Sequence, residues 1–104
     1  MANQVNLTMD GSVAVVRVDN PPVNALSHAV RAGLQGSFRA ALSRAETKAV
    51  VICCAGRSFF AGADIREFGK PPLAPFLPDL ITEIEAAQVP VIAAMHGNVL
   101  GGGL

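Results

Sequence analysis

Two apolar segments of strand length each lead into a turn of small residues, and this repeated order constrains the fold more than any other feature. The stretch from Val50 to Gly62 begins as a strand and leads into the turn "FFAGAD". The stretch from Val91 to Gly103 likewise begins as a strand and ends in the turn "LGGG". Continuous apolar strands are typical of parallel sheets that are covered on both faces. Ligands of such sheets bind at the carboxyl ends of the strands. The sequence therefore predicts an α/β fold with both glycine-containing turns on one side of the sheet.

The N-terminal region predicts a hairpin followed by one helix. Residues 5–9 alternate weakly, Asp10-Gly11 is a turn signal, and residues 13–18 form a β-branched run. Asn20-Pro21-Pro22 ends the second strand, because proline cannot donate to a sheet. Ser27 is the expected cap of a helix of about 16 residues. The buried stripe expected for this helix is Val30, Leu34, Phe38, Ala41 and Ala45.

The remaining elements are expected to continue the sheet. Gly33 and Gly36 lower the propensity of the first helix by up to about 1 kcal/mol each, so we interpret both as sites of close packing. Residues 48–54 predict a strand that pairs in parallel after a crossover. The proline-rich residues 71–78 predict an irregular loop that can act as a lid. A short helix is expected to start at Asp79 with the inward stripe Leu80, Ile81, Ile84 and Ala87, and Pro90 is expected to start a third buried strand with an open edge.

Composition and charge argue against several function classes. The chain is 51% hydrophobic and 15% charged with zero formal net charge, so we expect no nucleic acid and no membrane as partner. No signal peptide is visible, and the cytoplasm is the expected location. With two histidines and no Cys-x-x-Cys spacing, no metal site is expected. The adjacent Cys53 and Cys54 are interpreted as buried, unreactive thiols.

The two small-residue turns suggest a site for a negatively charged oxygen. Small residues let backbone amides face outward, and a helix that begins there adds a partial positive charge. Asp64 is expected to cap such a helix, with Glu67 completing a capping box. Ala63 in the first turn and Gly102 in the second then offer two amides to one oxyanion. There are two alternatives to an oxyanion site: the turns serve structure alone, or they bind a phosphate group. Neither of the phosphate-binding motifs GxxxxGK[ST] and GxGxxG is present.

"FFAGADIREF" followed by "PVIAAMHGNVLGGGL" resembles the paired signature of the enoyl-CoA hydratase/isomerase (crotonase) superfamily. "VDNPPVNALS" is similar to the family's early segment, and the region from "GKPPLAPF" to "LPDLITEIE" resembles the hydratase region of bifunctional enoyl-CoA hydratase/3-hydroxyacyl-CoA dehydrogenases. The resemblance implies a spiral of ββα turns with mainly parallel strands. It also implies that residues 1–104 are the N-terminal part of one such domain, which continues past the second glycine-rich turn.

The resemblance also implies the residues of the site. The backbone amides of Ala63 and Gly102 would hold the thioester oxygen of an acyl-CoA, whose coenzyme A is part of the substrate, so no separate cofactor is expected. Arg66 could approach the phosphates of the nucleotide. Positions that match coenzyme A or substrate contacts of the family are Ala25, Leu26, Ala61, Asp64, Ile65, Arg66 and Gly101.

The acid/base glutamates of the hydratases would follow Leu104, so no residue is nominated as catalytic base. Glu67 is interpreted as a capping partner, Glu83 and Glu85 as solvated surface, and His96 as a packing or turn residue. The expected function is an enoyl-CoA hydratase of fatty acid β-oxidation, with residues 1–104 expected to be inactive by themselves. The complete enzyme is expected to be a homo-oligomer or to be fused to a dehydrogenase. The alternatives are an isomerase or other crotonase reaction, and a non-catalytic chain that binds acyl-CoA or associates.

Overall fold

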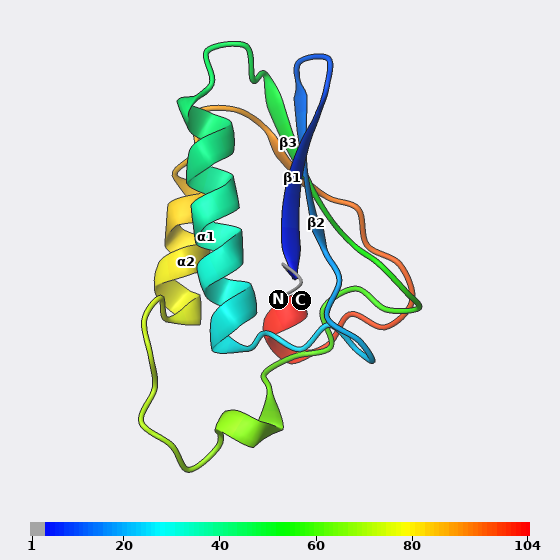
Figure 1. Ribbon diagram of the computed structural model, residues 1–104, viewed down its shortest axis with the longest axis vertical. Helices are drawn as coiled ribbons and strands as arrows, with labels where there is room; N and C mark the ends of the chain where they lie inside the picture. Colours follow the sequence, from blue (N-terminus) through cyan, green and yellow to red (C-terminus); the bar gives the residue numbers. More distant parts are fainter. Residues whose placement is uncertain (1–3) are drawn as a thin grey trace.

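The computed structural model describes residues 4–104 and contains one four-stranded sheet with two helices on one face (Figure 1). The strands are β1 (Val5–Asp10), β2 (Val13–Val18), β3 (Ala49–Cys54) and β4 (Val91–Ala93), in the order β1-β2-β3-β4. β1 and β2 form the expected antiparallel hairpin, whereas β2–β3 and β3–β4 pair in parallel. The predicted α/β class with mainly parallel pairing is therefore confirmed.

The core lies where β2 and β3 face the helices. The register pairs Ala14 with Val50, Val16 with Ile52 and Val18 with Cys54, and all six side chains are buried. Alternate residues of a strand point to the same face, so these six form one continuous apolar layer. Phe59 and Phe60 extend the layer past the end of β3 and contact each other edge to face.

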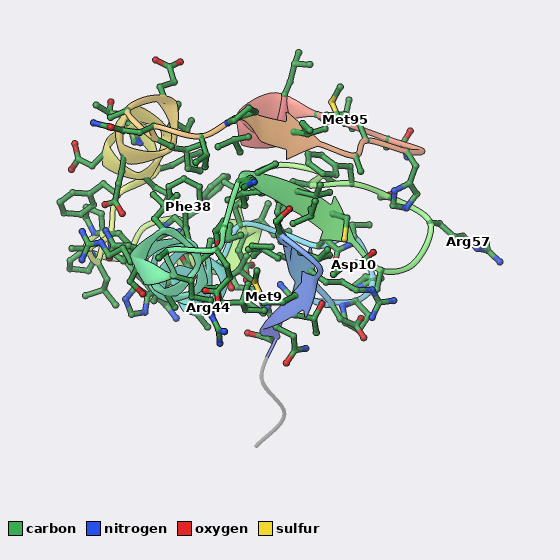
Figure 2. The ribbon with its side chains drawn as sticks, turned by 90° about the horizontal axis from the view of Figure 1, so that it is seen from above. Met9, Asp10, Phe38, Arg44, Arg57 and Met95 are labelled. Carbon is green, nitrogen blue, oxygen red and sulfur yellow. The ribbon has the colours of Figure 1, made fainter. Side chains whose placement is uncertain are left out.

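Helix α1 (His28–Ser43) covers this layer. The Ser27 side chain accepts a hydrogen bond from the Val30 amide, which confirms the predicted cap. The buried stripe is confirmed except at Ala45, which is exposed because the helix ends at Ser43. Figure 2 shows Phe38 of this stripe pointing into the interior between the helices and the sheet.

The two glycines of α1 differ in their surroundings. A Cβ on Gly33 would lie 2.7 Å from Cγ2 of Val5, so the helix and β1 approach closely there as predicted. A Cβ on Gly36 would meet nothing within 4 Å, so close packing at Gly36 was a wrong interpretation.

Helix α2 (Leu77–Glu85) begins two residues earlier than predicted. Pro78 lies in its first turn, where the missing amide is tolerated because no intrahelical acceptor exists for it. The preceding proline-rich segment has no regular structure up to Phe76, as predicted. Leu80 is buried and Ile84 and Ala87 pack against the core, but Ile81 is 42% exposed and does not belong to the inward stripe.

Strand β4 forms the predicted open edge of the sheet but is not buried as expected. Ile92 is 52% exposed, and Met95, which follows the strand, lies on the outer side of this segment (Figure 2). Only β3 pairs with β4 among residues 4–104, so one side of the strand has no partner there. Within the same residues, no helix has the length and apolarity needed to cross a bilayer, and no cluster of three or more metal-ligand side chains occurs.

Candidate functional site

The two glycine-containing turns lie against each other. A Cβ on Gly101 would lie 3.5 Å from the Cα of Gly62, and a Cβ on Gly103 would overlap the carbonyl oxygen of Phe60. The Leu100 amide also donates to the Phe60 carbonyl at 3.2 Å. A side chain at Gly103 would therefore separate the two segments, whereas Gly101 is in ordinary van der Waals range of Gly62. The expectation that the two turns lie together on one side of the sheet is confirmed by these contacts.

Asn24 holds the first turn in place from a distant part of the chain. Its side-chain amide donates to the carbonyls of Ala55 (2.8 Å) and Ser58 (2.9 Å), and its Oδ1 accepts from the Asn20 amide at 2.8 Å. Asn24 is buried and has a φ of 53°, a left-handed conformation that asparagine tolerates better than most residues. Asn24 was not predicted as a site residue, although an asparagine two positions after Pro-Pro is a turn signal.

The amides of Ala63 and Gly102 are available to a ligand. Both residues are exposed, and neither backbone N–H donates to another group of residues 4–104. Leu26 joins them: it forms a parallel bridge with Ala63, and a Cβ on Gly102 would lie 3.3 Å from its Cδ1. Ala63 lies just before the short 3₁₀ turn η1 (Ile65–Glu67), and Gly102 lies within a second one, η2 (Gly101–Gly103).

The other site residues implied by the resemblance differ in how far they are exposed to solvent. Leu26 and Asp64 are buried, and Ala25 and Ala61 are half-buried. Ile65, Arg66 and Gly101 are exposed, and the Ile65 side chain is among the most exposed apolar groups of the chain. The exposed members can meet a ligand directly, whereas Leu26 contributes through its position beneath the two turns.

Asp64 caps η1, as predicted, and holds Arg66. Its carboxylate accepts from the Arg66 amide at 2.9 Å and from the Arg66 guanidinium at 2.7 Å. These hydrogen bonds lower the pKa of Asp64 to about 2. Arg66 remains largely exposed, so its charge stays at the surface beside the first turn while Asp64 neutralises part of it.

Glu67 does not complete a capping box with Asp64, which corrects the prediction. Its carboxylate instead accepts from the His28 amide at 2.7 Å and from the Arg31 guanidinium at 3.2 Å, so it caps the first turn of α1. The His28 hydrogen bond is the main cause of the lowered pKa of Glu67. A capping box needs the helix to continue, whereas η1 ends at Glu67 itself.

Glu83 and His96 also have partners. Glu83 pairs with Arg39 (2.8 Å) and with Gln35 (3.2 Å), which joins α2 to α1, so its interpretation as solvated surface was wrong. Glu85 is exposed as predicted. His96, interpreted as a packing or turn residue, makes structural contacts: its carbonyl accepts from the Phe59 amide, and Nε2 lies 2.8 Å from the Gly56 carbonyl.

Two cavities adjoin the exposed amides. The larger, of about 710 Å³, has Ala63 in its wall and lies between η1 and the segment of residues 70–78. The smaller, of about 200 Å³, is lined by apolar side chains together with Gly102 and Gly103. Leu77 borders both cavities. A volume of about 300–1,000 Å³ is typical of ligand sites, so the larger cavity can accept a small molecule that also reaches Ala63.

The mixed sheet, with its two touching turns, has the crotonase fold of solved enoyl-CoA hydratases. The family model described as enoyl-CoA hydratase/isomerase matches residues 8–104. The chain belongs to the enoyl-CoA hydratase/isomerase family.

The relatives connect the chain to the hydratase region of bifunctional enzymes. It is 50% identical to the peroxisomal bifunctional enzyme of Danio rerio, over 88% of this chain and 13% of that protein. It is 45% identical to the peroxisomal fatty acid beta-oxidation multifunctional protein MFP2 of Arabidopsis thaliana, over 88% and 14% of the two chains. A probable enoyl-CoA hydratase of Bacillus subtilis is 38% identical, over 98% of this chain and 42% of its own length. The chain thus spans less than half of these relatives.

Solved structures agree with the fold. A probable enoyl-CoA hydratase/isomerase from Mycobacterium abscessus superimposes with a TM-score of 0.85 at 28% identity, covering 99% of this chain and 41% of that one. The resemblance seen in the sequence is therefore confirmed by both the family and the fold.

Proposed function

We propose that this chain supplies the thioester-binding part of an enoyl-CoA hydratase that acts in fatty acid β-oxidation. The observation that carries the proposal is the pair of exposed amides, at Ala63 and Gly102, which project from two touching turns and have no acceptor within residues 4–104. Family membership and the relatives named for enoyl-CoA hydration and β-oxidation support the assignment.

The chemistry follows from where charge develops. When water adds to a trans-2-enoyl-CoA, a general base takes one of its protons, its oxygen bonds to the β-carbon, and the double-bond electrons move toward the thioester oxygen to give an enolate. Two backbone donors aimed at that oxygen stabilise the enolate more than the neutral thioester. Each such donor typically contributes about 3–4 kcal/mol to the barrier reduction. The α-carbon then takes a proton and restores the carbonyl.

The carboxylates nearest to Ala63 are poorly suited to move these protons. Asp64 is ion-paired with Arg66 and has a pKa of about 2, and Glu67 has a lowered pKa because it accepts from His28 and Arg31. A general base works best when its pKa is near the operating pH. We therefore assign residues 4–104 the stabilisation of charge, and we assign neither carboxylate the role of base.

Substrate and partners belong to the same proposal. The acyl group of an acyl-CoA fits the apolar cavity beside Ala63. The exposed guanidinium of Arg66, which pairs with Asp64, offers a positive charge to the phosphates of coenzyme A. A dehydrogenase part in the same protein would match the relatives that are named bifunctional enzymes.

Binding and turnover test the proposal together. Crotonyl-CoA is added to the chain, affinity is measured by calorimetry, and hydration is followed as loss of absorbance of the conjugated thioester. We expect crotonyl-CoA to bind more tightly than coenzyme A alone, because only the thioester engages the two amides. Equal affinity for both would contradict the assignment. Conversion of a trans-3-enoyl-CoA without any hydration of crotonyl-CoA would favour an isomerase instead.

A further inference from the structure

The segment of residues 73–75 is tied to the first turn of α1 by three consecutive carbonyl groups. Arg31 donates from Nη2 to the Leu73 carbonyl (3.2 Å) and from Nε to the Pro75 carbonyl (2.9 Å). His28 Nε2 lies 2.8 Å from the Ala74 carbonyl between them. No regular structure holds this segment, so these side-chain contacts carry much of its attachment to the rest of the molecule.

The Arg31 guanidinium is at the centre of this arrangement. Its Nη1 also donates to the Leu26 carbonyl at 2.7 Å and to Glu67 at 3.2 Å, and the side chain is only 11% exposed. The Arg31 side chain therefore connects three parts of the chain: Leu26, Glu67 at the end of η1, and the proline-rich segment. Lysine cannot reproduce such a fork of donors, because it presents a single ammonium group.

The tethered segment forms one wall of the larger cavity. Pro71, Pro72, Leu73 and Phe76 line it, and Ala63 lies in the same cavity. Leu73 is 57% exposed and Phe76 is 42% exposed, so their apolar surface is available to a ligand and is not used in the core. The position of this apolar wall relative to Ala63 depends on the contacts of Arg31.

We propose that Arg31 is a positioning residue that sets specificity for the apolar acyl chain by fixing the 73–76 wall at its distance from Ala63. This inference rests on the proposed function, because it takes the ligand of the cavity to be an acyl-CoA. A short acyl group that stays near Ala63 does not need the wall. A long acyl chain buries its methylene groups against Leu73 and Phe76 and gains affinity with each one.

The test compares Arg31→Ala and Arg31→Lys with the matched variant Arg39→Ala. Arg39 lies on the same helix, and its ion pair with Glu83 is remote from the larger cavity. Affinity is measured for crotonyl-CoA and for trans-2-decenoyl-CoA. We expect Arg31→Ala to weaken binding of the ten-carbon ligand about tenfold and binding of crotonyl-CoA less than about twofold. Arg31→Lys should recover part of the difference, and Arg39→Ala should leave the ratio of the two affinities unchanged.

A ligand-free measurement separates the inference from the proposed function. Hydrogen exchange of the peptide covering residues 68–77 should accelerate in Arg31→Ala and not in Arg39→Ala. Equal losses for both ligands, or unchanged exchange, would overturn the role of Arg31. If the unmodified chain binds neither ligand while exchange still responds to Arg31, the tether is real, but the acyl-CoA assignment and the specificity role that rests on it are wrong.

Discussion

Gly62 and Gly101 are in backbone contact although 38 residues separate them in the sequence: a Cβ on Gly101 would lie 3.5 Å from the Cα of Gly62. Each glycine has a positive φ, and each directly precedes a residue whose amide is free, Ala63 in one turn and Gly102 in the other. The contact brings the two donors to one place. The positive φ at both positions favours glycine, because residues with a Cβ rarely adopt this backbone conformation.

The glycines of helix α1 should respond in opposite directions to substitution. Gly36→Ala should raise the free energy of unfolding by about 0.5–1 kcal/mol, since alanine favours helix and nothing lies within 4 Å of the new methyl group. Gly33→Ala should be destabilising, because its Cβ would come within 2.7 Å of Val5. Urea denaturation of both variants measures the difference. If both substitutions raise the free energy of unfolding, β1 and α1 do not pack as closely at Gly33 as the 2.7 Å distance to Val5 implies.

Stability should fall as acid protonates Asp64. The folded-state pKa of Asp64 is about 2, below the ordinary value of 3.8, so its contribution is present above about pH 4 and is lost as the pH falls toward 2. Asp64→Asn should make this loss shallower, and Arg66→Ala should do the same by removing the partner. Denaturation at pH 7, 4 and 3 checks the sign. A steeper acid loss in Asp64→Asn would exclude the ion pair as its cause.

Removing the Glu67 carboxylate should destabilise the chain by about 1–2 kcal/mol, because the His28 amide at the start of α1 then loses its acceptor. Glu67→Gln keeps an acceptor oxygen and should lose less than Glu67→Ala. Glu85→Ala is the matched control, since Glu85 is exposed on α2, and it should change stability by less than about 0.5 kcal/mol. If Glu67→Ala and Glu85→Ala reduce stability equally, Glu67 does not stabilise the chain by capping α1.

The two cysteines should differ in reactivity. Burial raises the pKa of Cys54 to about 12, so at pH 8 only about one molecule in ten thousand carries its thiolate. Cys53 is only half-buried, on the opposite face of β3, so the prediction that both thiols are buried was wrong for Cys53. A thiol reagent such as DTNB should therefore modify one cysteine in the native chain and two after denaturation, and Cys53→Ser should abolish the native reaction. Rapid native modification of Cys53→Ser would contradict the burial of Cys54.

Local patterns in the sequence predicted most of the fold. The hairpin, the Ser27 cap, the α1 stripe up to Ala41 and the parallel pairing of β3 all follow from turn chemistry and periodicity. The errors occur where long-range contacts decide the outcome. Ile81 has helical spacing but is 42% exposed, and β4 lies at the predicted edge but is not buried, since Ile92 is 52% exposed.

Only those parts of the candidate site that belong to a recognisable sequence motif could be predicted. The small residues around Ala63 and Gly102 are visible in the sequence, and the structure brings these two turns into contact. Asn24, Arg31 and the capping of α1 by Glu67 were not anticipated, because each connects segments that lie more than thirty positions apart. Such contacts leave no local periodicity from which they could be inferred.

The central claim is that the amides of Ala63 and Gly102 hold the thioester oxygen, and amide NMR tests it most directly. The chain is labelled with ¹⁵N, and spectra are recorded while crotonyl-CoA or, separately, coenzyme A is added. We expect downfield shifts of the Ala63 and Gly102 amide protons with crotonyl-CoA, and much smaller shifts at these two positions with coenzyme A. If crotonyl-CoA binds and shifts other amides but leaves these two unchanged, the two amides do not hold the thioester oxygen.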